Sequence, residues 1–213
     1  MVLEYCKNGS LESYLLKNKQ KFQNQVSHGT FVEECELLVG NQFAPLQLLN
    51  WTSDIAKAVE FIHCKRVIHG DLASRNILLT SNLTAKVGDF GLSRQLVGTS
   101  CYTKKTRCPL PWRNMAIESL KQMQFSVKSD IWALGITLWE IYTLGDKPYV
   151  GMRYNSDFIK LLQGGMRPPK PNNIEERLYE FMLKCWDAVP GNRPSVTKLK
   201  DICDVIRRGD VNT

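Results

Sequence analysis

The chain has 213 residues, of which 43% are hydrophobic and 23% charged, and its formal net charge is +7. These proportions are typical of a soluble globular domain with a sizeable core. Lysines and arginines are scattered rather than gathered into a dense patch, so we expect no nucleic-acid partner. The longest apolar run, residues 131–139, is too short to span a bilayer and predicts a buried core helix.

Seven cysteines are present, and no two are spaced as Cys-x-x-Cys. An odd number without that spacing argues against a disulfide framework and against a zinc site, and it fits a reducing compartment. We therefore expect the chain itself to be soluble and cytoplasmic, and to reach a membrane only through a segment upstream of Met1.

The first predicted element is a short helix over residues 10–16, because Ser10 can cap it and Glu12 lies in its first turn. Residues 17–45 then change character and become rich in Lys, Gln and Asn. Such a composition predicts an inserted surface segment that is partly disordered.

Order resumes at Pro45, and apolar residues recur at the spacing of one helix face over residues 55–62. This pattern predicts an amphipathic helix that ends near Cys64. Two histidines, His28 and His63, lie in no recognisable pattern of partners, and we interpret them as surface or cap residues.

Two short strands are predicted next, at residues 77–79 and 85–87, separated by a Thr-Ser-Asn turn. If the strands pair as a hairpin, the residues just outside them meet at one end. Asn76 and Asp89 would then lie close enough to share a ligand.

No periodic pattern covers residues 92–118, which predicts a long loop of a kind that is uncommon in a compact domain unless it is functional. After it, Ser126 is expected to cap a helix that runs to about Tyr142. Three further helices are predicted at residues 157–162, 174–186 and 195–206.

The stretch at residues 69–76, His-Gly-Asp-Leu-Ala-Ser-Arg-Asn, resembles the catalytic loop of protein kinases, and the Asp-Phe-Gly at residues 89–91 resembles their metal-binding triplet. Phosphoryl transfer needs positioning, neutralisation of charge and a group that accepts the hydroxyl proton. Asp71 is the candidate for that acceptor. Asn76 and Asp89 offer the oxygen atoms that Mg²⁺ prefers.

The Ala-Ser-Arg at residues 73–75 resembles the Ala-Ala-Arg of protein tyrosine kinases, whereas serine/threonine kinases usually carry Lys-Pro-Glu there. Residues 4–11 and the insert that follows resemble receptor kinases of the growth-factor type. The resemblance implies an α+β protein-kinase-like fold with a mainly α-helical C-terminal lobe, short β-hairpins and no N-terminal lobe. Further matches lie at residues 115–120, 129–135, 184–186 and 192–194.

By this resemblance, residues 1–6 are the hinge remnant of the N-terminal lobe, residues 7–206 are the C-terminal lobe and residues 207–213 are a tail. Within the lobe, residues 17–45 correspond to the kinase insert and residues 89–118 to the activation segment. The glycine-rich loop, the strand lysine and the helix glutamate of the N-terminal lobe have no counterpart in the 213 residues. We therefore expect this chain alone to be inactive.

The resemblance also implies the ligands and the reaction. ATP and Mg²⁺, which Mn²⁺ can replace, are the expected cofactors, and the γ-phosphoryl group passes to tyrosine hydroxyls of proteins or peptides. A receptor of this type would dimerise and present its kinase domain on the cytoplasmic side of the plasma membrane. The implied ATP-binding residues are Glu4, Cys6 and Leu78.

Further roles come from the same resemblance. Arg75 joins Asp71 and Asn76 in the catalytic set, and Tyr102 is the expected autophosphorylation site. Glu118 and Arg193 are expected to form a buried, bidentate ion pair. The residues with implied structural roles are His69, Glu118, Asp130 and Arg193.

Four residues depart from the family pattern: Gly70 replaces Arg, Asn114 replaces Trp, Ile117 replaces Pro, and Asp146 stands where a second Gly is common. Because the Arg before the catalytic Asp normally pairs with a phosphorylated activation segment, Gly70 predicts a weaker coupling. The departures leave open a kinase-fold binding or scaffold protein without transfer activity. A serine/threonine kinase is the third reading, and residues 73–75 disfavour it.

Overall fold

At the centre of the fold lies α4, Val127–Tyr142, in which every residue from 129 to 141 is buried. The computed structural model describes residues 4–26, 45–96, 99–103, 110–172 and 174–209. As predicted, Ser126 caps α4. Its hydroxyl accepts from the Ser129 amide, and the Ser129 hydroxyl accepts from the Ser126 amide, which completes a capping box. A helix that is apolar on all sides is stable only inside a core.

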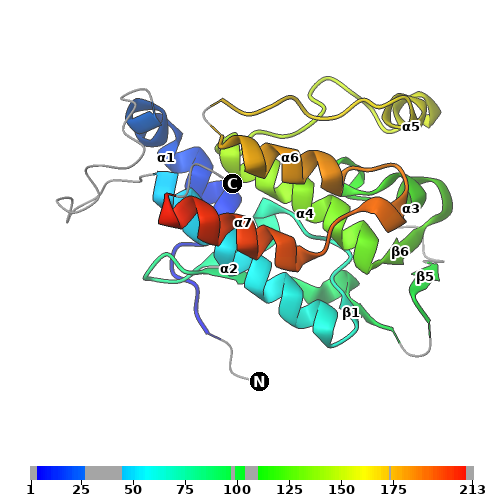
Figure 1. Cartoon of the computed structure of the whole chain (residues 1–213), viewed down its shortest axis with the longest axis horizontal. Coiled ribbons are helices and arrows are strands. Elements are labelled where there is room, and N and C mark those ends of the chain that lie inside the picture. The colour runs from blue at the N-terminus through cyan, green and yellow to red at the C-terminus, as the bar shows by residue number, and fades with distance from the viewer. Residues whose placement is uncertain (1–3, 27–44, 97–98, 104–109, 173, 210–213) are drawn as a thin grey trace.

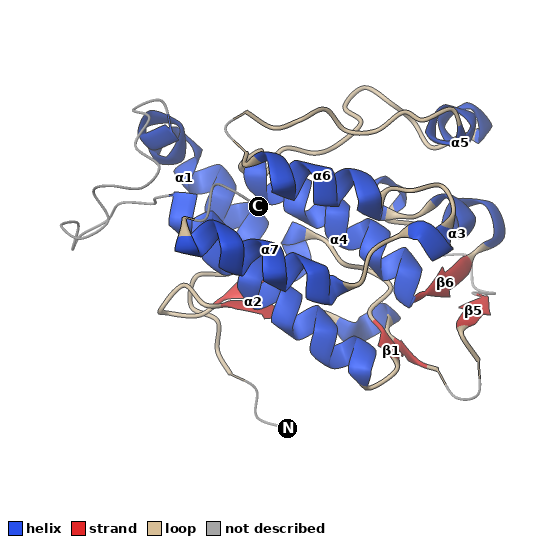
Figure 2. Ribbon diagram, in the orientation of Figure 1, coloured by secondary structure: helices blue, strands red, loops and turns tan. Residues whose placement is uncertain are grey.

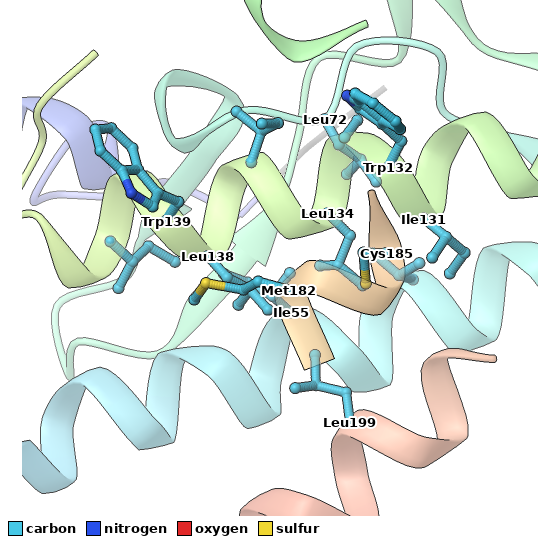
Figure 3. Close-up of a cluster of buried hydrophobic side chains, with 14 of the residues drawn as sticks. Ile55, Leu72, Ile131, Trp132, Leu134, Leu138, Trp139, Met182, Cys185 and Leu199 are labelled. Atoms are coloured by element: carbon cyan, nitrogen blue, oxygen red, sulfur yellow. The ribbon is translucent and has the colours of Figure 1, made fainter. Parts of the chain in front are cut away.

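α2 and α6 pack against α4, and α7 covers these two helices; all three run roughly along α4 in Figures 1 and 2. α6 packs directly on α4, and α7 packs on α2. Figure 3 shows Leu134 and Leu138 of α4 gathered with Met182 and Cys185 of α6 and with Ile55 of α2. The bounds of these helices are Pro45–Cys64 for α2, Glu176–Cys185 for α6 and Val196–Arg208 for α7.

The close approach of α4 and α6 depends on Gly135. A Cβ atom at this position would lie 2.7 Å from Nε1 of Trp186 and 2.8 Å from Cβ of Cys185. Contacts under 3.0 Å are sterically excluded, so any side chain at Gly135 would force the two helices apart.

The first helix is longer than predicted. α1 spans Leu11–Val26, so the helix does not stop at residue 16 and continues into the segment predicted to be an insert. Phe22 is 1% exposed, and its ring lies 6.2 Å from that of Trp51 on α2. Packing against α2 therefore stabilises a polar sequence that local propensity leaves undecided. Residues 27–44 lie outside the described residues.

The described strands form three antiparallel pairs, and the predicted hairpin is one of them. β2, Ile77–Leu79, pairs with β3, Ala85–Val87, with Ile77 opposite Val87. The stretch predicted as loop, residues 92–118, contributes one strand to each of the other two pairs, because long-range pairing orders it. These pairs are β1, Val67–Ile68, with β4, Arg94–Gln95, and β5, Cys101–Thr103, with β6, Gln124–Ser126.

The remaining elements are short, and two of them, the turns at residues 74–76 and 112–114, pack against α4. Among the described residues, we find no helix with the length and apolar character needed to cross a membrane. Two helices complete the fold, α3 at Ile117–Gln122 and α5 at Ser156–Gln163, together with 3₁₀ turns η1 at Ser74–Asn76, η2 at Phe90–Leu92, η3 at Trp112–Asn114 and η4 at Pro190–Asn192.

Candidate active site

The loop before Asp71 is fastened to α4 by one buried carboxylate. Asp130 is 1% exposed; its Oδ2 accepts from the His69 amide at 2.8 Å and its Oδ1 from the Gly70 amide at 2.9 Å. Gly70 has a φ of +79°, a conformation that costs glycine little and other residues more. The backbone thus reaches Asp71 along a path fixed by α4.

His63 also reaches Asp130, so its interpretation as a surface or cap residue is wrong. Its Nε2 lies 3.1 Å from Oδ2 of Asp130, and its side chain is 14% exposed. Sequence reasoning missed this partner because the two residues are 67 positions apart and meet only when α2 packs beside α4.

The Asp71 carboxylate is oriented by two neighbours in its own loop. Arg75 forms an ion pair with Oδ1 through Nη2. Asn76 donates from Nδ2 to Oδ2 at 2.9 Å and to the backbone oxygen of Asp71 at 2.7 Å. The side chain of Asp71 is 14% exposed, so one face is open to a reactant while two donors fix its direction. The structure thus brings together the three residues predicted as the catalytic set.

His69 connects this loop to the Asp-Phe-Gly triplet. Its ring is fully buried, with Nε2 2.9 Å from the backbone oxygen of Gly88, while Nδ1 accepts from the Asp71 amide at 3.3 Å. The ring also lies 5.0 Å from that of Phe90. His69 therefore packs and hydrogen-bonds the loops that hold Asp71 and Asp89.

Asn76 and Asp89 lie at the same end of the β2–β3 hairpin, as predicted. The Gly88 amide donates to the backbone oxygen of Asn76 at 2.8 Å, which places Asp89 one residue beyond the pairing. Asp89 has a left-handed φ of 54°, and its Oδ1 accepts from the Gly91 amide at 3.2 Å. A carboxylate and an amide oxygen at one end of a hairpin fit a hard divalent cation such as Mg²⁺.

The predicted ATP-binding residues lie along β2 and β3. The Leu79 amide donates to the oxygen of Gly9 at 2.9 Å, so the N-terminal segment runs beside β2. Leu78 points outward and is 36% exposed, and Glu4 is exposed, with its carboxylate 3.4 Å from Nζ of Lys86. Cys6 is half-buried on the same segment.

Tyr102, the predicted phosphorylation site, packs inward. Its ring stacks on Phe125 with centroids 5.3 Å apart, and its hydroxyl donates to the oxygen of Leu92 at 3.3 Å. Burial raises the pKa of this hydroxyl. A Cβ atom at Gly70 would lie 3.5 Å from the hydroxyl and 3.0 Å from the Leu92 oxygen, so Tyr102 occupies space that a side chain at residue 70 would crowd.

The predicted pair between Glu118 and Arg193 is present and bidentate. Nη1 and Nη2 of Arg193 donate to the two carboxylate oxygens at 2.6 and 2.8 Å. Arg193 is 2% exposed, and it also donates to the backbone oxygens of Lys128 and Asp187. The pair ties the start of α3 to the loop before α7.

A second buried carboxylate on α4, Glu140, was missed in the sequence. It is 5% exposed; Oε2 accepts from the Ser74 amide at 2.8 Å and Oε1 from Nδ2 of Asn114 at 3.1 Å. Burial raises the pKa of Glu140, while its hydrogen bonds and Arg75 lower it by less. An acidic residue at the end of an apolar run was the available signal, because a buried charge needs partners.

The chain matches a protein family and several curated relatives. A family model described as protein tyrosine and serine/threonine kinase matches residues 1–202. The tyrosine kinase receptor Cad96Ca of Drosophila melanogaster is 36% identical over 96% of this chain and 25% of its own length. The platelet-derived growth factor receptor alpha of Homo sapiens is 40% identical over 77% of this chain and 15% of its own length. A fibroblast growth factor receptor of Halocynthia roretzi is 34% identical over 96% of this chain and 27% of its own length. The chain thus spans about a quarter or less of the length of these relatives.

Proposed function

The chain belongs to the protein tyrosine and serine/threonine kinase family, and we propose that it forms the catalytic lobe of a receptor-type tyrosine kinase. Its reaction is transfer of the ATP γ-phosphoryl group to tyrosine hydroxyls of proteins. The observation that carries this proposal is the Asp71 carboxylate, which Arg75 and Asn76 orient beside the Asp89 end of the β2–β3 hairpin.

The positions of the residues support the roles proposed for them. Asp71 orients the substrate hydroxyl and accepts its proton, and Arg75 and Asn76 hold its carboxylate in place. Asn76 and Asp89 would hold Mg²⁺, or Mn²⁺ in its place. When bound, the cation neutralises charge on the phosphates. Glu4, Cys6 and Leu78 are the proposed adenine contacts, alongside β2.

The domain assignment belongs to the same proposal. Residues 1–6 act as the hinge, residues 7–206 as the C-terminal lobe, residues 89–118 as the activation segment and residues 207–213 as a tail. Tyr102 is its phosphorylation site. The protein carrying this lobe dimerises as a receptor, with the lobe on the cytoplasmic side of the plasma membrane.

A second candidate function, a kinase-fold scaffold without transfer activity, is favoured by one local observation. Gly70 stands where kinases usually carry an Arg that pairs with the phosphorylated activation segment. The hydroxyl of Tyr102 lies beside Gly70 and donates to the Leu92 oxygen instead. The retained set of Asp71, Asn76 and Asp89 supports the enzyme over the scaffold, because a scaffold has no need of their arrangement.

The test joins this chain to the N-terminal lobe of a receptor tyrosine kinase and measures transfer to a tyrosine peptide. Asp71→Asn should lower kcat by roughly 10²–10⁴-fold with little change in nucleotide binding. Asp89→Asn should also lose Mg²⁺-dependent nucleotide affinity. Asp157→Asn, an exposed carboxylate on α5, is the matched control.

Equal turnover of all four proteins would refute the enzyme assignment. Transfer to serine rather than tyrosine peptides would refute the substrate class and leave the catalytic residues standing.

A further inference from the structure

We infer that Glu140 is a positioning residue that couples the catalytic loop to the segment at residues 110–116, so that the two move as one unit. The inference rests on the proposed function for its catalytic meaning. Its physical basis is independent of that function: one carboxylate, buried on the central helix, accepts from both segments.

One end of this connection lies within the catalytic loop. Ser74 opens η1, whose cap residue Ala73 supplies no side-chain hydrogen bond. The free amide at the start of a helical turn needs an acceptor, and Glu140 Oε2 provides it at 2.8 Å. The next residue is Arg75, which is paired with Asp71. A shift of the Ser74 amide would therefore move the groups that orient the proposed base.

The other end lies in η3, where Asn114 is 5% exposed and donates to Oε1 of Glu140. The same turn also contacts α5 through Trp112, whose ring centroid lies 4.8 Å from that of Phe158 in an edge arrangement. Contacts with both α5 and Glu140 give η3 a fixed position relative to α4.

The two segments face each other across a small cavity. Its lining includes Asp71 from the catalytic loop and Pro111, Asn114 and Met115 from residues 110–116. A peptide whose tyrosine reaches Asp71 would pass this lining, so the spacing of the two segments sets how the hydroxyl meets the carboxylate. Positioning to a fraction of an ångström matters strongly for such a transfer.

The carboxylate is well suited to this role because its two oxygens serve two donors at once. Leucine at residue 140 would fill similar space and hold neither segment. Glutamine would keep an acceptor for Ser74, and its amide could pair with Asn114 after that side chain turns over. Glu140→Gln is therefore the conservative variant, and Asn114→Leu cuts the connection at the end distant from Ser74.

The experiment measures amide hydrogen exchange in the 213-residue chain, with the Ser74 amide referenced to that of Leu134 inside α4. The reference removes any change in global stability. We expect Asn114→Leu to speed relative exchange at Ser74 about tenfold, because hydrogen bonds to Glu140 link residues 114 and 74. Glu140→Leu should do at least as much, and Glu140→Gln should restore protection to within about threefold.

Thr137→Val is the matched control. Thr137 is buried on the same helix, and its hydroxyl donates to the Ala133 oxygen within that helix. If Asn114→Leu changes Ser74 exchange no more than Thr137→Val does, the two segments are held independently and the inference is wrong.

A kinetic measurement separates positioning from mere support of the fold. In the lobe-joined enzyme, Asn114→Leu should raise KM for the tyrosine peptide and leave KM for ATP unchanged; equal changes in both would overturn the inference. Hydrogen exchange is measured without turnover. Absence of transfer activity would therefore refute the proposed function, whereas the exchange rate of the Ser74 amide alone decides the coupling.

Discussion

Two arginine–carboxylate pairs in this molecule show how the same chemistry serves the fold in one place and the proposed reaction in another. Arg193 has a side chain with no exposed surface, and fixed partners surround it: both oxygens of Glu118 and two backbone oxygens. Arg75 has a side chain that is 38% exposed and pairs with Asp71 four residues earlier. The first arginine is immobilised by the fold, while the second stays open to solvent beside the candidate base.

The difference in burial decides how much each ion pair contributes to stability. A buried ion pair costs much when one partner is removed, because the other is left without compensation. An exposed pair is screened by water and contributes little to stability. Exposure is therefore useful at Arg75, since a substrate must reach Asp71, and burial is useful at Arg193, since it joins segments 75 residues apart.

The largest expected effect tests this contrast directly. Arg193→Ala should lower the free energy of unfolding by about 3–5 kcal/mol, because it leaves the Glu118 carboxylate without its ion-pair partner and two backbone oxygens without their donor. Denaturant unfolding measures the loss, which is a large part of the stability of a typical domain. Glu118→Ala should behave similarly, and the double variant should lose less than the sum.

Arg75→Ala is the comparison within the same chain. We expect it to change the free energy of unfolding by less than about 1 kcal/mol, as for other partly exposed pairs. A loss as large as that of Arg193→Ala, or simple additivity of Arg193→Ala and Glu118→Ala, would break the distinction between the two pairs.

A smaller effect is expected at Glu140, a buried carboxylate whose hydrogen-bond donors are neutral. Burial raises its pKa above the ordinary 4.5, against the lowering by Ser74, Asn114 and Arg75. A carboxyl raised in this way contributes its stability when protonated and loses that contribution as pH rises through the folded pKa. Glu140→Gln stays neutral, so its free energy of unfolding should gain on the wild type as pH rises above about 4.5.

Urea unfolding at a series of pH values measures this gain, and the two proteins should converge at acidic pH. Curves that run parallel throughout would mean that Glu140 titrates alike in the folded and unfolded chains. Burial would then not raise the pKa of Glu140 in the folded protein.

The smallest expected effect concerns Tyr102 in the proposed activation segment. Tyr102→Phe keeps the stack on Phe125 and removes one long hydrogen bond to Leu92. Stability should fall by about 0.5 kcal/mol, and transfer activity of the lobe-joined enzyme should change by no more than about threefold. Loss of nearly all activity would show that a basic group elsewhere in the protein binds phosphorylated Tyr102 in place of the Arg that Gly70 replaces.

Local signals in the sequence were enough for several parts of this protein. The helical spacing before Cys64, the Ser126 cap and the strand–turn–strand pattern after Asn76 each act over a few residues, and all three appear in the structure as predicted. The resemblance at residues 69–76 and 89–91 placed the candidate site, and the hairpin between Asn76 and Asp89 leaves little freedom in how these two residues lie.

Contacts between distant segments decided the rest. The continuation of α1 depends on Phe22 meeting Trp51, the role of His63 depends on α2 lying beside α4, and the link through Glu140 joins residues on three elements. The sequence by itself determined the chemistry available, since residue types and short spacings specify caps, hairpins and the oxygen donors of the site. Only the tertiary structure decided which buried charge meets which partner, because the cost of burying a charge is relieved by groups that folding brings together from far along the chain.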